Sequence, residues 1–470
     1  MGTLTHSSLT GRVLKTMGVF GSLEVLTMLC AVIRTKLVAL WLGAAGVGVI
    51  SLYNSTLELL RVITQLNLRQ SAVREIAAVP GDERSAVAVI TLKLGFWLGV
   101  GGTVLVAVLS PLLSLVTFGS YDYTCGFAIL SVTMFVSTVA DSHRTVLQAM
   151  DRLRSLAVAS LWGALVATVL ALPLFYFFRM QAIVPVLLVF PAASLAVLML
   201  YKYDLPKMRP AFPQFKRISA SILRLGAYLS VAHCMGAFTE YVLRVYINAV
   251  ADTATVGLFQ SGFTIINSYV GVIFTAIAME FYPRLSATIK RQNFTRIVVS
   301  HEIGLTVAVL MPVVVIFVSA DQLIVRLLYS DRFLAIVPFI SVAILSTFLR
   351  AVSWCFSYVI VAKGEGRVYI LTEASSAISL IVLSYFGWTY GGLTGLGYAY
   401  LGQYVVFTAV TWWVCDRRYG IRLPLRTIVM IAAACVVGVA ALAFKLWLGW
   451  WAPLLLLPAV LPVTYRSIRR

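Results

Sequence analysis

Residues 156–201 read LAVASLWGALVATVLALPLFYFFRMQAIVPVLLVFPAASLAVLMLY and contain a single charged residue, Arg179. On each side of Arg179 lies an apolar run of about 20 residues, the length that an α-helix needs to cross the hydrocarbon core of a bilayer. Because lipid offers the backbone no hydrogen-bond partner, both runs are predicted to be helical. This stretch therefore predicts two membrane-spanning helices joined by a short turn.

Similar apolar runs recur along all 470 residues. The chain is 60% hydrophobic and only 12% charged, with a mean hydropathy of +0.94, which leaves too little polar surface for a soluble protein of this size. The short alternating segments of a β-barrel do not occur. We predict fourteen spans, at 17–42, 47–68, 85–116, 125–143, 156–178, 182–201, 218–245, 253–283, 297–319, 334–362, 368–388, 392–415, 428–444 and 451–465.

The formal net charge of +19 is distributed unevenly across the predicted loops. With the N-terminus inside, most Lys and Arg residues fall in inward loops. An excess of positive charge on the inner side indicates orientation, so both termini are predicted to be cytoplasmic. The positive charge is therefore interpreted as a signal of membrane orientation, and no nucleic-acid partner is expected. Of the Lys and Arg residues, the outward loops hold only four: Arg179, Arg326, Arg332 and Lys445.

Several classes of function lack their sequence signals. The chain contains no Gly-Lys pair and hence no Walker A motif, and its six cysteines and four histidines form no CxxC or HExxH pattern. No cofactor or metal is expected. A polyprenyl-lipid glycosyltransferase or polymerase would need large acidic outer loops, whereas the longest outward loop, about 320–333, offers only Asp321 and Asp331. The chain is thus expected not to be an enzyme.

The sequence contains a diverged copy of itself. VIR at 32–34 recurs as VLR at 242–244, 210 residues later, and Arg74 matches Arg284 at the same offset. Each copy holds six spans, and this even number gives both copies the same orientation. Their symmetry axis is then predicted to run along the membrane normal, as in transporters with parallel repeats.

The predicted fold is an all-α polytopic membrane protein with two six-helix lobes related by a pseudo-two-fold axis, plus a C-terminal helix pair. The linker between the lobes carries five cations and three prolines, so it is expected to be extended near the membrane surface. The predicted divisions are the N-terminal lobe with helices 1–6 at 1–201, the cytoplasmic linker at 202–217, the C-terminal lobe with helices 7–12 at 218–415, and helices 13–14 at 416–470.

The second span carries a polar stripe. Asn54, Glu58, Arg61 and Gln65 are spaced i, i+4, i+7 and i+11, which places them on one helix face. A charged group in lipid costs about 2.5–3.5 kcal/mol on insertion scales, so this face is expected to contact protein or water. Glu58 and Arg61 can pair along the helix. A structural ion pair and a role in a substrate cavity both remain open for them.

Three other spans carry polar residues with the same helical spacing. We interpret their small hydroxyl residues as interhelical hydrogen-bonding groups. Asp141 and Arg144 lie near the cytoplasmic end of their span, which favours a gate or a surface pair. Gln260 and Asn267 are candidate substrate-binding residues. The three sets are Gln260, Thr264 and Asn267; Ser137, Asp141, Arg144 and Gln148; and Ser346, Arg350, Ser353 and Ser357.

Three arginines are candidates for a central binding site. Arg34 lies about 12 Å deep by helix rise, and Arg244 is its partner in the repeat. Glu240 either neutralises Arg244 or takes part in gating and coupling, whereas Arg350 has no acidic partner in its own helix. Guanidinium groups bind phosphate and carboxylate oxygens in pairs, so they favour an anionic substrate. A cationic drug exporter would instead need acidic sites and aromatic walls.

These residues also resemble a known family. VIRTKLVALWLGAAGVGVISLYNSTLELLRVITQLNLRQSAVREIA at 32–77 is similar to the amino-terminal signature of O-antigen translocases of the Wzx type, in the multidrug/oligosaccharidyl-lipid/polysaccharide exporter superfamily. GRVYILTEA at 366–374 resembles a recurrent piece of their second lobe. The glycine-rich GGLTGLG at 391–397 resembles their turn into span twelve.

The resemblance implies a flippase that moves undecaprenyl-pyrophosphate-linked oligosaccharide across the bacterial inner membrane by alternating access. Related lipid II flippases have a cationic central cavity and an arginine late in helix one, where this chain has Arg34. The acidic residue that follows in those proteins is Thr35 here, which weakens a lipid II assignment. Members often have twelve spans, so twelve and fourteen both remain open.

Partners and energy source follow from the same resemblance. The expected partners are lipid-linked oligosaccharide, membrane lipid, and a polysaccharide polymerase with its chain-length regulator. H+ and Na+ are the candidate coupling ions, with Glu58 and Asp141 as candidate coupling carboxylates. The alternatives are a cation-coupled multidrug exporter of the same superfamily and a lipid II flippase.

Overall fold

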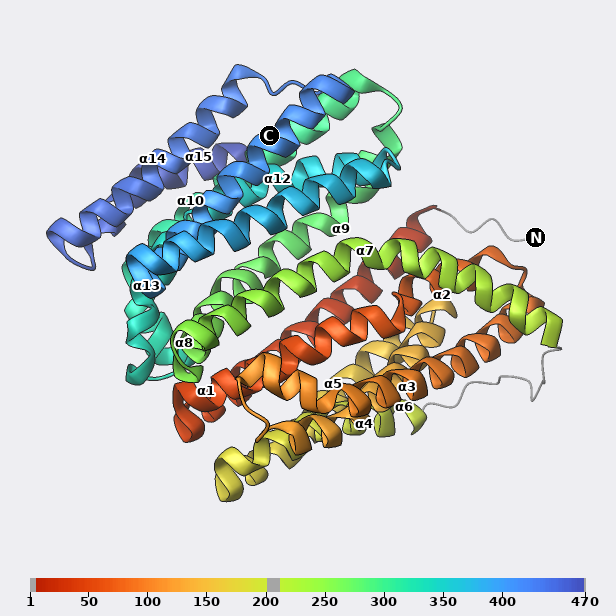
Figure 1. The fold of residues 1–470 in the computed structure, drawn as a ribbon. Helices are drawn as coiled ribbons and strands as arrows, with labels where there is room; N and C mark the ends of the chain where they lie inside the picture. The colour runs from red at the N-terminus through yellow and green to blue at the C-terminus, as the bar shows by residue number, and fades with distance from the viewer. Residues whose placement is uncertain (1–5, 201–211, 469–470) are drawn as a thin grey trace. The chain divides into compact units, whose positions relative to one another are not determined.

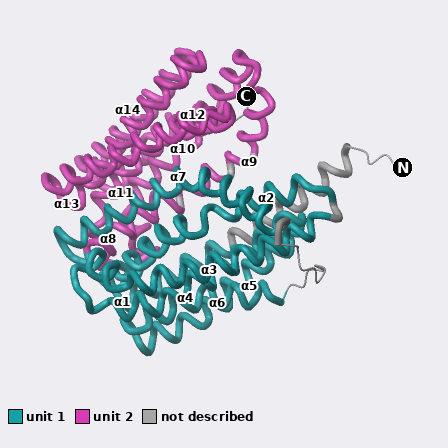
Figure 2. The backbone as a smooth tube through the Cα atoms, turned by 45° about the vertical axis from the view of Figure 1, so that its right-hand side comes forward, with its two compact units in different colours: residues 1–254 teal, residues 255–470 magenta. Residues whose placement is uncertain are grey.

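The computed structural model describes residues 6–200 and 212–468, and these residues form helices and no strand (Figure 1). The all-α fold expected from composition and hydropathy is thereby confirmed. The chain divides into two compact units, residues 1–254 and 255–470 (Figure 2).

In the first unit, α3 packs on α4, α5 packs on α6, and α7 contacts α1, α2 and α3. A core of Ile76, Ile90, Val146 and Ile222 joins α2, α3, α4 and α7. We predicted α7 to open the second lobe, but it shares the core of the first unit; the lobe boundaries stay a prediction. The helices are α1 (His6–Gln65), α2 (Leu68–Ala78), α3 (Gly81–Phe118), α4 (Thr124–Ala149), α5 (Leu153–Phe178), η1 (Arg179–Ala182), α6 (Ile183–Leu200) and α7 (Phe212–Val250).

The second unit is built around α10, whose Val307, Leu310 and Val314 are fully buried. α9, α12, α14 and α15 all pack against it. The helices are α8 (Thr253–Thr264), which begins at the boundary, the π-helix η2 (Ile265–Tyr269), α9 (Gly271–Thr288), α10 (Gln292–Leu328), η3 (Asp331–Ile336), α11 (Val337–Ala343), α12 (Ser346–Ala362), α13 (Gly366–Tyr419), α14 (Leu425–Leu448), η4 (Ala452–Leu456) and α15 (Leu457–Ile468).

Within the described ranges, nine helices are long and apolar enough to cross a membrane, or up to ten if the bent pair of Asp331–Ala343 and Ser346–Ala362 counts as one span. Three of the nine contain 53, 48 and 54 residues, whereas a straight helix needs only about 20 residues to cross the ~30 Å hydrocarbon core. These three are Leu26–Ala78, Leu153–Leu200 and Gly366–Tyr419.

Each of the three long helices is interrupted where we predicted a boundary between two spans. Gly43 breaks α1 and Gly392 breaks α13, both with a positive φ that glycine adopts without strain. Arg179 ends α5 before α6 begins. Fourteen spans stay a prediction, with these breaks at the predicted positions.

Some predicted boundaries were wrong. The predicted span 218–245 lies within α7, but α7 begins at Phe212, so residues 212–217 of the predicted extended linker are helical. The rest of the predicted linker lies outside the described residues. Asp321 and Lys445, assigned to outward loops, lie inside α10 and α14 and pair with each other. Hydropathy alone reads such charges as loop because it does not include their pairing.

The two halves of α13 meet at glycines. A Cβ on Gly395 would lie 1.8 Å from the carbonyl oxygen of Gly387, and a backbone atom cannot move aside as a side-chain tip can. We therefore expect Gly395→Ala to lower the free energy of unfolding by about 1–3 kcal/mol through overpacking. The control is Gly391→Ala, because Gly391 has open space around it. Equal thermal midpoints of the two variants in detergent would contradict this packing.

Candidate functional site

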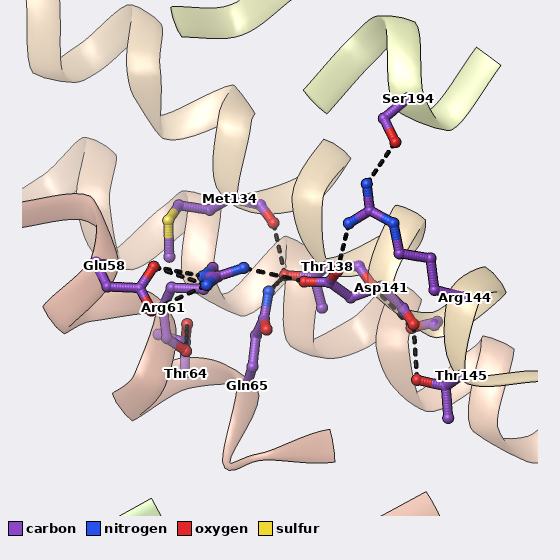
Figure 3. Close-up of polar contacts among 11 residues, drawn as sticks. Glu58, Arg61, Thr64, Gln65, Met134, Thr138, Asp141, Arg144, Thr145 and Ser194 are labelled. Carbon is purple, nitrogen blue, oxygen red and sulfur yellow. Dashed lines mark hydrogen bonds and ion pairs between the residues drawn. The ribbon is translucent and has the colours of Figure 1, made fainter. Parts of the chain in front are cut away.

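The polar stripe predicted on the second half of α1 contains an ion pair. The guanidinium of Arg61 donates from Nε and Nη2 to the two carboxylate oxygens of Glu58, each at 2.9 Å (Figure 3). Such bidentate pairs are stronger and more directional than a single contact. Asn54, one turn before Glu58, is exposed. The i, i+3 pairing that we predicted from spacing is thus present.

This ion pair continues across the first unit into α4 and α6. Nη1 of Arg61 lies 3.2 Å from Asp141, and Asp141 lies 2.8 Å from Nη1 of Arg144. Arg144 in turn donates from Nη2 to the hydroxyl of Ser194 in α6 (Figure 3). We had interpreted the two pairs separately, whereas the fold joins them through Asp141. We call Glu58, Arg61, Asp141 and Arg144 the charge network.

A second link joins the same two helices. Gln65 donates from its amide to the hydroxyl of Thr138, at 2.9 Å, and Thr138 donates to the carbonyl of Met134. Gln65 and Thr138 lie one turn beyond the charged pairs on α1 and one turn before Asp141 on α4 (Figure 3). The predicted stripes of spans two and four therefore face each other.

The exposure of the charge network decides what it contacts. Side-chain exposure is 49% for Glu58 and 37% for Arg61, but only 17% for Asp141. Glu58 lies near the middle of predicted span 47–68, where contact with lipid would cost several kcal/mol. We therefore expect the exposed end of the network to face water within the membrane, while its other end is packed between helices. Two acidic and two basic groups leave the network neutral.

Arg34 lies on α1 before the break and stacks on an aromatic ring. Its guanidinium carbon is 4.1 Å from the ring centroid of Phe190 in α6. Phe190 and Ser194 lie one turn apart on α6, so the same helix supports both Arg34 and Arg144. The sequence predicted α6 as a membrane span but not its contacts with the site, because Phe190 and Ser194 belong to an apolar run without a polar stripe.

Arg244 forms its own cluster between α7 and α1. Its side chain is 5% exposed, and Nε donates to the hydroxyl of Ser51 at 3.0 Å. Nη1 donates to the carbonyl of Glu240, and Nη2 lies 3.1 Å from the Glu240 carboxylate. The pairing with Glu240 that we left open is present. The substrate-binding role of Arg244 and the gating or coupling role of Glu240 stay predictions.

Gln260, Asn267 and Arg350 were predicted as site residues in the second unit, and the structure places Asn267 and Arg350 in one cluster. Nη1 of Arg350 donates to the side-chain oxygen of Asn267 at 3.0 Å, and the hydroxyl of Tyr400 donates to the same oxygen at 2.6 Å. Gln260 instead donates to Thr264 on its own helix. Tyr400 was not predicted as a site residue, although it follows the glycine-rich turn quoted above.

The described part of the chain contains no group of three or more His, Cys, Asp or Glu side chains that could hold a metal ion. The side chains that the candidate site offers are guanidinium, carboxylate, amide and hydroxyl groups. Its members come from α1, α4 and α6 of one unit, and a separate cluster comes from α9, α12 and α13 with η2 of the other.

Comparison with protein families matches residues 37–338 to the family described as polysaccharide biosynthesis protein. The chain belongs to this family. The matched region contains the whole charge network as well as Arg244 and Asn267. The resemblance noted from the sequence is thereby confirmed at the level of the family.

Among curated proteins, the lipid III flippase of Escherichia coli strain K12 is 23% identical over 392 residues, which cover 79% of this chain and 90% of that protein. The lipid III flippase of Shigella flexneri aligns equally well. These relatives are named as flippases and not as enzymes, in agreement with the expectation from the sequence.

Among solved structures, the lipid II flippase MurJ in an inward closed conformation has a TM-score of 0.72 at 11% identity, covering 96% of this chain and 99% of that one. An inward-facing multidrug resistance MATE family transporter of the MOP superfamily has a TM-score of 0.69 at 15% identity, covering 87% and 95%. At such identities the likeness concerns the fold alone. The predicted all-α, multi-span membrane fold is confirmed.

Proposed function

We propose that this protein is a flippase that translocates undecaprenyl-pyrophosphate-linked oligosaccharide across the bacterial inner membrane. The observation that carries the proposal is the partly exposed charge network in a member of the polysaccharide biosynthesis family. Glu58 of this network lies near the middle of the predicted span 47–68. The lipid III flippase relatives support the same class of substrate. The excess of cationic loops on one side supports the proposal that both termini lie in the cytoplasm.

In this proposal the substrate head group enters a central cavity and is passed across by alternating access. Arg34 and Arg61 bind the pyrophosphate, because guanidinium groups match phosphate oxygens and a water-poor site weakens screening. Asn54 and Gln65 bind sugar hydroxyls. Arg244 is held by Ser51 and Glu240 in this conformation, so its binding role requires that those bonds exchange.

The charge network supplies a gate in the same proposal. A phosphate that pairs with Arg61 competes with Glu58 and Asp141, and weakening the bonds of Asp141 loosens the contact between α1 and α4. Substrate then shifts the conformational balance by its differential affinity for the two states. Glu58 and Asp141 are the proposed coupling carboxylates for H+ or Na+. A polysaccharide polymerase and a chain-length regulator are the proposed partners downstream.

The second candidate is a cation-coupled multidrug exporter, favoured by the structural likeness to MATE transporters. Ligand-induced thermal stabilisation of the purified protein separates the two. The flippase is expected to be stabilised by polyprenyl-pyrophosphate sugars and not by cationic drugs. The reverse result would establish the exporter. A preference for lipid II over other lipid-linked sugars would support a lipid II flippase, against the departure at Thr35.

Arg34 provides a test of the proposed head-group contact. We expect Arg34→Ala to slow flipping at least tenfold, since loss of one charge-assisted contact is worth about 1.5–3 kcal/mol. Arg34→Lys should retain part of the rate, because it keeps the charge but loses the planar guanidinium. Arg154→Ala, an exposed arginine of α5, is the matched control. Flipping by Arg34→Ala at the wild-type rate would remove Arg34 from the proposal.

A further inference from the structure

In the second unit, two neighbouring side chains fix the orientation of Arg350. Arg350 in α12 donates from Nη1 to Asn267, and its guanidinium carbon lies 4.9 Å from the ring centroid of Phe274 in α9. Asn267 is itself fixed, because its oxygen also accepts from Tyr400 and its amide donates to the carbonyl of Phe263. The ring of Phe274 covers one face of the guanidinium, and the side-chain amide of Asn267 binds one edge.

This arginine is not neutralised by any of its neighbours in the described residues. The arginines at 61, 144, 244 and 284 each lie within 4.0 Å of a carboxylate, whereas Arg350 has none at that distance. The ionisable groups that act on it are the hydroxyls of Tyr400 and Tyr404, which carry no charge near pH 7. Asn267 contributes a dipole but no charge.

An uncompensated charge inside a membrane bundle is costly, and proteins usually keep one only where a ligand or a counter-ion meets it. The local backbone gives a second indication. Asn267 sits in the π-helix η2, a distortion that occurs frequently at functional sites. Within this π-helix, the side chain of Asn267 accepts the hydrogen bond from Arg350, and Gly271 follows one turn later.

The space beside the guanidinium is open at Gly271. Among the described residues, and apart from the backbone of its own helix, a Cβ built on Gly271 would have one neighbour within 4 Å, Nη2 of Arg350 at 3.9 Å. A guanidinium carries five N–H donors, and Asn267 takes one of them. The remaining donors exceed the two that a bidentate carboxylate uses, and they suit the several oxygens of a phosphate group.

We infer that Arg350, Asn267 and Phe274, with the open space at Gly271, form a phosphate-binding site within the second unit. The site shares no residue with the charge network of the first unit. It deepens the proposed function and rests on it only for the source of the phosphate, which is either the lipid-linked pyrophosphate or free inorganic phosphate.

The test measures thermal midpoints of the full-length protein in detergent with increasing inorganic pyrophosphate, at constant ionic strength. We expect saturable stabilisation of the wild type, and an apparent Kd at least tenfold higher for Arg350→Met. Arg332→Met, which removes an exposed arginine from the same unit, should behave as wild type. Gly271→Val keeps the charge but fills the open space, and it should also weaken the response.

The unliganded proteins distinguish a binding site from a structural arginine. Without Arg350, the oxygen of Asn267 still accepts from Tyr400, so Arg350→Met should unfold at the wild-type temperature or above it in phosphate-free buffer. A clearly lower midpoint would show a structural role and overturn the inference. So would a wild type that does not respond to pyrophosphate, or an unchanged response in Arg350→Met and Gly271→Val.

Two further arms identify the source and separate the inference from the proposed function. Stronger stabilisation by undecaprenyl pyrophosphate than by inorganic phosphate assigns the site to the lipid-linked substrate, and the opposite order assigns it to free phosphate. Either order supports a phosphate site. If glucuronate stabilised the wild type as strongly as inorganic pyrophosphate or more strongly, the inference of a phosphate site would be overturned. Failure of the wild type to flip lipid-linked sugar would contradict the proposed function and leave this binding measurement unchanged.

Discussion

We expect Asp141→Asn to lower the free energy of unfolding by up to about 3 kcal/mol and to slow translocation at least tenfold. Asp141 is the one carboxylate that both Arg61 and Arg144 contact in the charge network. Removal of one partner from a buried pair typically costs about 3–5 kcal/mol, and the partial exposure of this network places the effect near the lower end. Arg144 would keep Ser194 but lose its counter-charge.

A second substitution tests whether charge balance is the cause. Asp141→Asn combined with Arg144→Gln restores neutrality, so the double variant should recover most of the lost stability. It should not recover translocation if the two residues act as a gate. The control is Asp151→Asn, an exposed carboxylate just after α4. Additive losses in the double variant, measured by thermal and denaturant unfolding, would contradict the network.

The second large effect is expected at Lys445 in α14. Its ammonium contacts the carboxylate of Asp321 in α10, and Ser341 in α11 donates to the same oxygen of that carboxylate. Asp321 is fully buried and Lys445 is 12% exposed. Lys445→Met would leave a buried carboxylate without its counter-charge, so we expect a loss of about 3–5 kcal/mol in the free energy of unfolding.

The matched pair for this prediction joins Arg326, near the end of α10, to Asp331, the first residue of η3. Arg326 and Asp331 form an ion pair in which both side chains are more than half exposed, so Arg326→Met should cost less than about 1 kcal/mol. Lys445→Met with Asp321→Asn should regain stability, because neither residue then carries a charge. If Lys445→Met and Arg326→Met unfold at the same temperature, the buried pair does not hold α14 on α10.

Local spacing predicted those parts of the site that lie on a single helix. Glu58 and Arg61 are three residues apart, and Glu240 and Arg244 are four apart, so their pairing follows from the helical repeat. The breaks at Gly43 and Gly392 also fall at predicted boundaries, because apolar length and glycine mark them directly.

Contacts between helices could not be predicted in the same way. Asp141 meets Arg61 across 80 residues, and nothing in the spacing of either helix identifies the other as its neighbour. Phe190 and Ser194 look like ordinary members of an apolar span. Asp321 and Lys445 were read as loop residues because a hydropathy pattern scores each charge alone, whereas the fold pairs them.

The most direct measurement of the central claim is translocation by the purified protein in proteoliposomes. Undecaprenyl-pyrophosphate-linked oligosaccharide is placed in both leaflets, and its exposure to an added membrane-impermeant glycosidase is followed over time. The proposal predicts that protein converts a plateau near half-digestion into nearly complete digestion, with Asp141→Asn at least tenfold slower than wild type. A plateau equal to that of protein-free liposomes, with correctly folded protein and intact vesicles, would contradict it.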